Sequence, residues 1–113
     1  MVRHPSQVPQ EDLYEIGAGT GRPGFMPALR AHLEHDFREH LERISCPTLI
    51  VWGAKDMVVP VRDATRYEQV IPNARKVVFE DTGHIPQMER APAFNALVEE
   101  FLAAERPLEA ATA

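Results

Sequence analysis

The sequence has 113 residues, enough for one small domain with a modest core. Its formal net charge of −5 and its lack of a basic run argue against a nucleic-acid partner. No apolar stretch reaches the roughly 18 residues of a membrane span, and the N-terminus lacks the apolar segment of a signal peptide. The single cysteine, Cys46, cannot form an internal disulfide. We therefore expect a soluble, cytoplasmic protein that contacts neither membrane nor nucleic acid, with the Cys46 thiol packed rather than reactive.

The first 46 residues carry mainly helical signals. Proline and two acids at residues 9–12 are typical of a first helical turn, and Gly17 is predicted to follow the end of that helix. A stripe of apolar residues then recurs every fourth position, which predicts a second helix. This stripe consists of Phe25, Leu29, Leu33 and Phe37. The capping-box spacing of Asp36 and Glu39 predicts a further helix that begins near Asp36.

Between the first two helices lies a glycine-rich stretch that has two interpretations. Gly19, Gly21 and Gly24 match G-x-G-x-x-G, and residues 14–22 resemble the first motif of S-adenosylmethionine-dependent methyltransferases. That motif needs a strand before the glycines, whereas here charged residues precede them. A flexible loop between helices is the favoured interpretation, and a methyltransferase fragment is kept as an alternative. No cofactor is expected.

A group of polar residues in the second helical region raises the question of a metal. His32, His35 and Glu39 would share one helical face, and two histidines with a carboxylate can bind a metal. The H-E-x-x-H spacing is absent, and a helix break at Asp36 would separate the group. A solvated polar face is the favoured interpretation, so no metal is expected.

The remaining chain has the pattern of a parallel α/β unit. Residues 48–52 are a short, mostly apolar run typical of a buried strand, and residues 76–80 resemble a second strand. A narrow apolar stripe at residues 61–70 predicts the crossover helix between them. A closing helix is predicted to open at residues 89–92, because proline is tolerated in a first helical turn. Its apolar residues are spaced i, i+3, i+4, i+7 and i+8, which indicates one apolar helical face. These residues are Phe94, Leu97, Val98, Phe101 and Leu102.

An acid and a histidine leave the same ends of the two strands. Asp56 follows the first strand and His84 follows the second. Alone, Asp56 would be interpreted as a turn residue and His84 as a structural one. Loops at the carboxyl ends of parallel strands meet at one edge of the sheet, where ligands and chemistry are found. An Asp–His pair at that edge suits proton transfer, because the carboxylate fixes the tautomer of the ring. We therefore predict a hydrogen bond between Asp56 and His84.

These features together resemble the C-terminal part of an α/β-hydrolase. The matching stretches are LERISCPTLIVWGAKD at 41–56, residues 59–60 and 71–74, and DTGHIPQMER at 81–90, followed by Phe94, Phe101 and Leu102. The resemblance implies an α/β fold with a parallel βαβ unit and a closing helix, preceded by lid-like helices. It implies that Asp56 is the triad acid and His84 the general base. The expected divisions are 1–46 (lid-like segment and lead-in helix), 47–104 (core segment) and 105–113 (frayed tail).

The sequence departs from the family where the nucleophile should lie. Triad order in this fold is nucleophile, acid, histidine, with the nucleophile on a G-x-S-x-G-like elbow. The only serines are Ser6 and Ser45, and neither lies between spaced glycines. We expect a truncated segment of a hydrolase that is catalytically silent alone; a non-catalytic binding module is a further alternative.

The missing nucleophile also leaves the reaction open. Serine chemistry would act on an ester or a carbon–carbon bond, and aspartate chemistry on an epoxide or a halide. Met57, Val58 and Ile85 flank the pair and are candidates to line a pocket for a small apolar substrate, with ordinary loop packing as the equal alternative. The two predicted strands would normally lie inside a larger sheet, so self-association through an exposed sheet edge is also expected.

Overall fold

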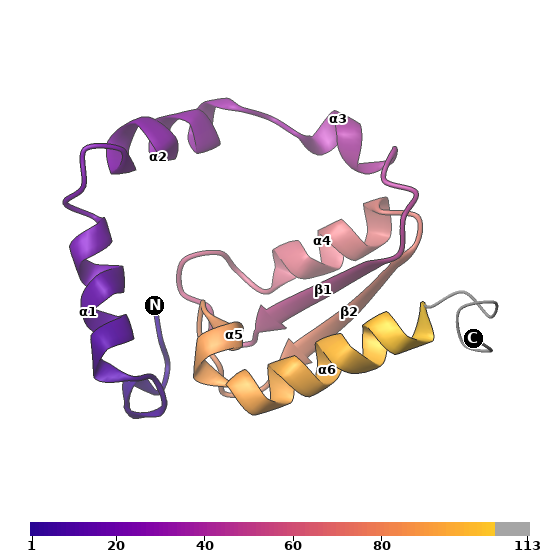
Figure 1. Cartoon of the computed structure of the whole chain (residues 1–113). Coiled ribbons are helices and arrows are strands. Elements are labelled where there is room, and N and C mark those ends of the chain that lie inside the picture. The colour runs from indigo at the N-terminus through magenta and orange to yellow at the C-terminus, as the bar shows by residue number, and fades with distance from the viewer. Residues whose placement is uncertain (106–113) are drawn as a thin grey trace, which may run out of the picture.

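The computed structural model describes residues 1–105, in which short helices surround a two-stranded parallel sheet (Figure 1). The elements in chain order are η1 (Pro5–Gln7), α1 (Gln10–Gly19), α2 (Phe25–Glu34), α3 (Arg38–Leu41), β1 (Thr48–Gly53), α4 (Arg62–Val70), β2 (Ala74–Phe79), α5 (Pro86–Glu89) and α6 (Ala91–Ala104). The frayed tail expected at 105–113 lies, after residue 105, outside the described residues.

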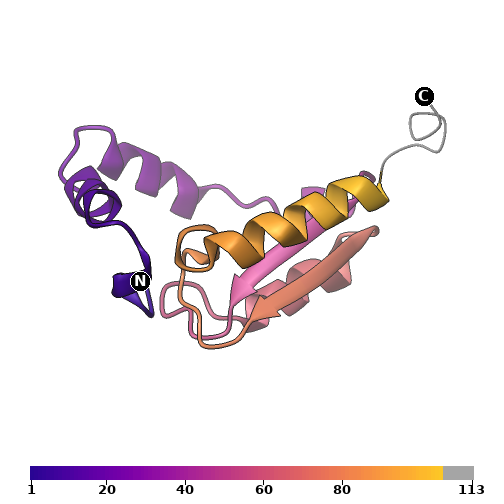
Figure 2. The same cartoon turned by 60° about the horizontal axis from the view of Figure 1, so that its bottom comes forward.

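The predicted βαβ unit is present. β1 and β2 pair in parallel, with Ile50 opposite Lys76 and Val51 opposite Val77, and α4 connects them. Both strands start or end within two residues of their predicted bounds. In Figure 2, α4 and α6 lie on opposite faces of the sheet, which is the layering that covers a parallel sheet on both sides.

The hydrophobic core is small and lies between the sheet and α4. Ile50, Ala64 and Ile71 are buried and pack together. Partly buried apolar residues surround them: Leu41, Ile44, Trp52 and Ala74. On the other face, α6 has no buried residue, although it carries the apolar stripe that predicted it. The core therefore holds the βαβ unit together but leaves the closing helix half covered.

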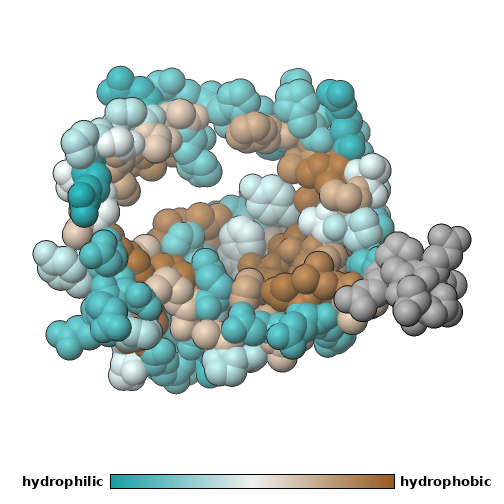
Figure 3. Space-filling view, in the orientation of Figure 1, coloured by the Kyte–Doolittle hydropathy of each residue, from teal (hydrophilic) through white to brown (hydrophobic). Residues whose placement is uncertain are grey.

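The helices α1 and α2 form an arc (residues 10–34) that stands away from the sheet (Figure 1). Figure 3 shows an opening between this arc and the rest of the molecule, with hydrophobic residues gathered over the sheet and α6. Within the arc, Leu33 is 75% exposed and Met26 is 60% exposed. The radius of gyration is 16.5 Å, compared with roughly 13 Å for a compact domain of this length.

One expectation about the N-terminal helices is wrong. The first helix does not end before Gly17 but continues through Gly19. Its backbone is thus satisfied by helical hydrogen bonds, and no strand precedes the glycines among residues 1–24. The strand–loop–helix context that a methyltransferase motif needs is therefore missing, and the structure gives that alternative no support. The helix predicted near Asp36 forms as α3, where the Asp36 carboxylate accepts a hydrogen bond from the Arg38 backbone N–H at 3.0 Å.

Two further differences concern the start of β1 and the end of the chain. Cys46 is exposed, not packed as expected, because the chain reaches the sheet only at Thr48. The closing helix α6 begins at Ala91 as predicted, but the separate turn of helix α5 before it is too short to leave a periodic signal. None of the helices within residues 1–105 combines the length and apolarity needed to cross a membrane.

Candidate active site

The acid loop after β1 holds Asp56 in a fixed orientation. The Asp56 side chain is 4% exposed. Its Oδ1 accepts hydrogen bonds from the backbone N–H groups of Val58 at 2.8 Å and Val59 at 2.9 Å. The same loop is tied to the strand, because the Trp52 indole N–H donates to the carbonyl of Val59 at 3.0 Å. One carboxylate oxygen is thereby occupied by the loop itself, which leaves Oδ2 for another partner.

The histidine loop after β2 brings His84 to that second oxygen. Asp81, at φ 50°, turns the chain out of the strand, a conformation that Asp tolerates better than most residues. The His84 Nδ1 lies 2.9 Å from the Asp56 Oδ2. This distance confirms the predicted hydrogen bond. No partner for the His84 Nε2 occurs among residues 1–105, and its ring is one third exposed.

The surroundings of Asp56 set its acidity. Burial raises the pKa of the Asp56 carboxyl, but the hydrogen bond from His84 and those from the Val59 and Val58 N–H groups lower it. The net result is a pKa below the ordinary value of 3.8. Asp56 is therefore an anion at neutral pH, as the acceptor of an imidazole N–H must be.

A small cavity of about 160 Å³ adjoins the pair. Its lining includes Trp52, Val59 and Pro86 beside Asp56 and His84. The candidate substrate-binding residues lie elsewhere: Met57 is 90% exposed and Val58 57% exposed, and Ile85 is half-buried outside the cavity lining. Their contact with a substrate stays a prediction. The aromatic and proline residues that do line the cavity were missed because they have the same apolar character as ordinary core residues.

The N-terminal segment (residues 1–4) packs against the histidine loop and forms hydrogen bonds with it. The His84 backbone N–H donates to the carbonyl of Met1 at 2.6 Å. The Arg3 Nε and the His4 Nε2 contact the Asp81 carboxylate at 3.0 and 2.7 Å. These hydrogen bonds lower the pKa of Asp81. No pattern in the sequence predicts this contact, because residues 1–8 have no periodicity.

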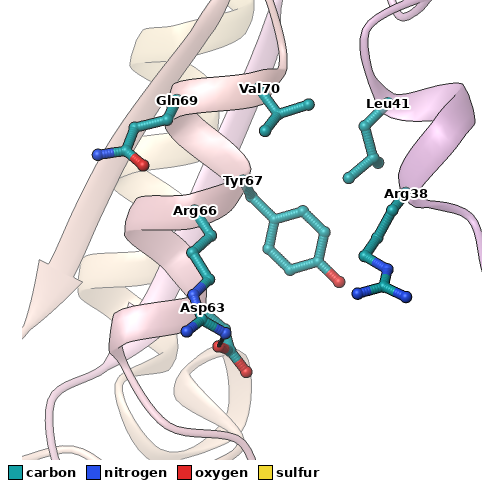
Figure 4. Close-up of a pocket in the computed structure, with 7 residues that line it drawn as sticks. All are labelled: Arg38, Leu41, Asp63, Arg66, Tyr67, Gln69 and Val70. Atoms are coloured by element: carbon teal, nitrogen blue, oxygen red, sulfur yellow. Dashed lines mark hydrogen bonds and ion pairs between the residues drawn. The ribbon is translucent and has the colours of Figure 1, made fainter.

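The largest of the described pockets, of about 620 Å³, does not include this pair. It lies between α3 and α4 and is lined by Arg38, Leu41, Asp63, Arg66, Tyr67, Gln69 and Val70 (Figure 4). Arg38 pairs with Asp36, and Arg66 pairs with Asp63, so carboxylates already neutralise both guanidinium groups. No group of three His, Cys, Asp or Glu side chains within residues 1–105 is arranged to hold a metal. The Asp56–His84 pair is therefore the best candidate site.

The chain matches known proteins over the same region. Residues 7–91 match the sequence profile of the alpha/beta hydrolase fold family. A 2-hydroxy-6-oxononadienedioate/2-hydroxy-6-oxononatrienedioate hydrolase of Pseudomonas putida is 46% identical over 67 residues, covering 59% of this chain and 23% of that protein. A hydrolase of the same name from Cupriavidus pinatubonensis is 38% identical over 90 residues, covering 68% of this chain and 31% of that protein.

A solved structure supports the same conclusion. The CarC serine hydrolase, involved in carbazole degradation, superposes with a TM-score of 0.65 at 26% identity, covering 72% of this chain and 32% of that one. The fold and the profile match together define the class of protein, the α/β-hydrolase fold. The chain belongs to the alpha/beta hydrolase fold family, and it spans 23% and 31% of the length of the two curated relatives.

Proposed function

We propose that this chain supplies the acid–base half of a hydrolase active site, with Asp56 as the orienting acid and His84 as the general base. The observation that carries the proposal is the 2.9 Å contact between the His84 Nδ1 and a nearly buried Asp56 carboxylate. If the carboxylate accepts the Nδ1 proton, Nε2 is left unprotonated and can accept a proton. Asp56 then stabilises the imidazolium that forms.

The nucleophile must come from outside these 113 residues. No G-x-S-x-G occurs in the sequence, and Ser6 and Ser45 lie on segments without the strand–turn–helix of a nucleophile elbow. In the assembled site, His84 would take the proton of the nucleophile during attack and return it to the leaving group. Loss of a triad nucleophile can cost about 10^6-fold in turnover, so the chain alone is expected to be silent.

The relatives favour one of the two chemistries that the sequence left open. The CarC structure is described as a serine hydrolase, and both curated relatives are named for 2-hydroxy-6-oxo-dioates. We therefore propose a serine nucleophile and a small substrate that is attacked at a carbonyl carbon. The apolar lining by Trp52, Val59 and Pro86 supports an apolar group next to that carbon.

A chimera tests this function. Residues 36–102 of this chain would replace the matching segment of the Pseudomonas putida hydrolase, which supplies the rest of the fold. Turnover of that hydrolase's own substrate would be measured for the chimera and for His84→Ala. The expected result is an active chimera that loses at least about 10^4-fold in kcat on His84→Ala.

His40→Ala is the matched control, because His40 is an exposed histidine in α3 within the same segment. It is expected to leave kcat unchanged. A folded but inactive chimera would favour the non-catalytic binding module, and an active chimera that tolerates His84→Ala would refute the assignment of the base.

A further inference from the structure

We propose that Glu89 is a positioning residue for His84, a role that rests on the proposed function of that histidine. Glu89 is the last residue of α5, five positions after His84, and is 2% exposed. A carboxyl group is seldom buried to this extent without partners. Its partners are two backbone N–H groups, and both belong to the segments that enclose the histidine.

The first partner fixes the residue next to the base. The Glu89 Oε2 accepts a hydrogen bond from the Gly83 N–H at 2.9 Å, inside the protein. Gly83 directly precedes His84, so this bond sets the direction in which the chain enters the histidine. The Glu89 backbone N–H donates to the Ile85 carbonyl at 3.0 Å. Glu89 thus forms hydrogen bonds with the residues on both sides of His84, Gly83 and Ile85.

The second partner, the His4 N–H, belongs to the N-terminal segment that packs on the outside of the histidine loop. The Glu89 Oε1 accepts a hydrogen bond from the His4 N–H at 2.5 Å, and the Met1 carbonyl in the same segment accepts from the His84 N–H at 2.6 Å. A Cβ atom on Gly83 would lie 2.5 Å from that Met1 oxygen. One carboxylate therefore joins the N-terminal segment to the histidine loop beside this close contact.

The His4 and Gly83 N–H groups each need an acceptor, and they donate to different oxygens of Glu89. A carboxylate meets this need because both of its oxygens are acceptors. Glutamine has nearly the same shape but presents an N–H₂ group toward one of the two backbone donors. Glu89→Gln therefore leaves one N–H facing another donor inside the protein. Whichever of the two N–H groups faces the amide N–H₂, the link between the N-terminal segment and the histidine loop is broken, and the His84 ring is expected to move away from Asp56.

The test is the tautomer of the His84 ring in the full-length chain, read from its ¹⁵N ring resonances by NMR at a pH where the ring is neutral. In the unmodified chain, we expect a proton on Nδ1 and a bare Nε2. Glu89→Gln is expected to abolish this preference while the amide resonances of β1 stay in place. Glu99→Gln, an exposed glutamate of α6, is the matched control and is expected to keep it. An unchanged tautomer in folded Glu89→Gln would overturn the proposal.

A second measurement applies if Glu89→Gln does not fold. In the unmodified chain under rising urea, the Gly83 amide and the Nδ1-protonated His84 signal are expected to be lost together, before the β1 amides. Persistence of that ring signal after the Gly83 amide exchanges freely would contradict the proposal. Both readouts are independent of turnover. An inactive chimera with a tautomer that responds to Glu89 would therefore reject the proposed function and retain the positioning role.

Discussion

A Cβ atom on Gly53 would lie 1.9 Å from the carbonyl oxygen of Gly83. Gly53 ends β1, and Gly83 immediately precedes His84 in the loop after β2. The two loops are joined at this point, because the Lys55 N–H donates to the Thr82 carbonyl at 2.8 Å. This close backbone contact brings the acid loop and the histidine loop near enough for Asp56 to reach His84.

Substitution of Gly53 by alanine should therefore weaken the fold. The added methyl group meets backbone atoms, which cannot rotate away, so Gly53→Ala is expected to lower the free energy of unfolding by about 1–3 kcal/mol. Urea denaturation followed by circular dichroism measures the change. Gly17→Ala is the control: it lies within α1 with no atom inside 4 Å of its added Cβ, and removal of a helical glycine should stabilise by roughly 0.5–1 kcal/mol. Equal effects of the two substitutions would contradict this account of Gly53.

The acidity of Asp56 should depend on His84. In His84→Ala, burial still raises the pKa of Asp56 but the strongest opposing hydrogen bond is gone, so the pKa should increase. The ¹³C resonance of the Asp56 carboxyl, followed from pH 2 to 6, measures it. His40→Ala should leave the titration unchanged, and an unaltered Asp56 midpoint in His84→Ala would mean that the two side chains do not interact in solution.

The lowered pKa of Asp56 in the unmodified chain also predicts how the free energy of unfolding depends on pH. Because the pKa of Asp56 in the folded chain lies below the unfolded value of 3.8, its contribution is fully present above that value and is lost as the pH falls through the folded pKa. The free energy of unfolding should thus fall in this acidic window, and less steeply in Asp56→Asn. Asp36, whose pKa is lowered to about 2, and Asp81, whose pKa is also lowered, contribute in an overlapping range. Both carboxyls are present in the unmodified chain and in Asp56→Asn, so the difference between the two curves belongs to Asp56. If the free energy of unfolding fell equally steeply with pH in the unmodified chain and in Asp56→Asn, the prediction would be contradicted.

The isolated chain should self-associate through its sheet edge. Within the described residues the sheet has only two strands, so each has one unpaired edge, and such edges tend to pair with other chains. Light scattering should give a mass that rises with concentration. Hydrogen exchange should then slow at β1 or β2 amides but not in α2. A monomer at all concentrations, or protection confined to α2, would exclude this route.

The core of the fold was predictable because its signals are local. Short runs rich in Val and Ile predict β1 and β2, and helical spacing predicts α4 and α6. The hydrogen bond between Asp56 and His84 followed from topology, since parallel neighbouring strands release their loops at one edge. The arrangement of residues 1–46 as a separate lid-like segment remains a prediction.

The missed features depend on contacts between residues far apart in the chain. His4 and Glu89 are 85 positions apart and meet through one backbone N–H, which leaves no pattern in the sequence. The helix α1 continues past Gly17 because its hydrogen bonds outweigh the modest cost of glycine in a helix. Met57 is apolar yet 90% exposed, because the loop turns inward at Asp56 to satisfy its carboxylate.

The most direct test of the Asp56–His84 pair is a double-mutant cycle on kcat in the chimera with the Pseudomonas putida hydrolase. Asp56→Asn should cost about 10^4-fold, because the ring loses its required tautomer. His84→Ala should cost more, and the double variant should be no slower than His84→Ala, because Asp56 acts only through the histidine. Asp63→Asn, which alters a half-buried carboxylate that pairs with Arg66, should leave kcat unchanged. Losses that multiply in the double variant, or an unchanged kcat in either single variant, would contradict the assignment of Asp56 and His84 as one catalytic unit.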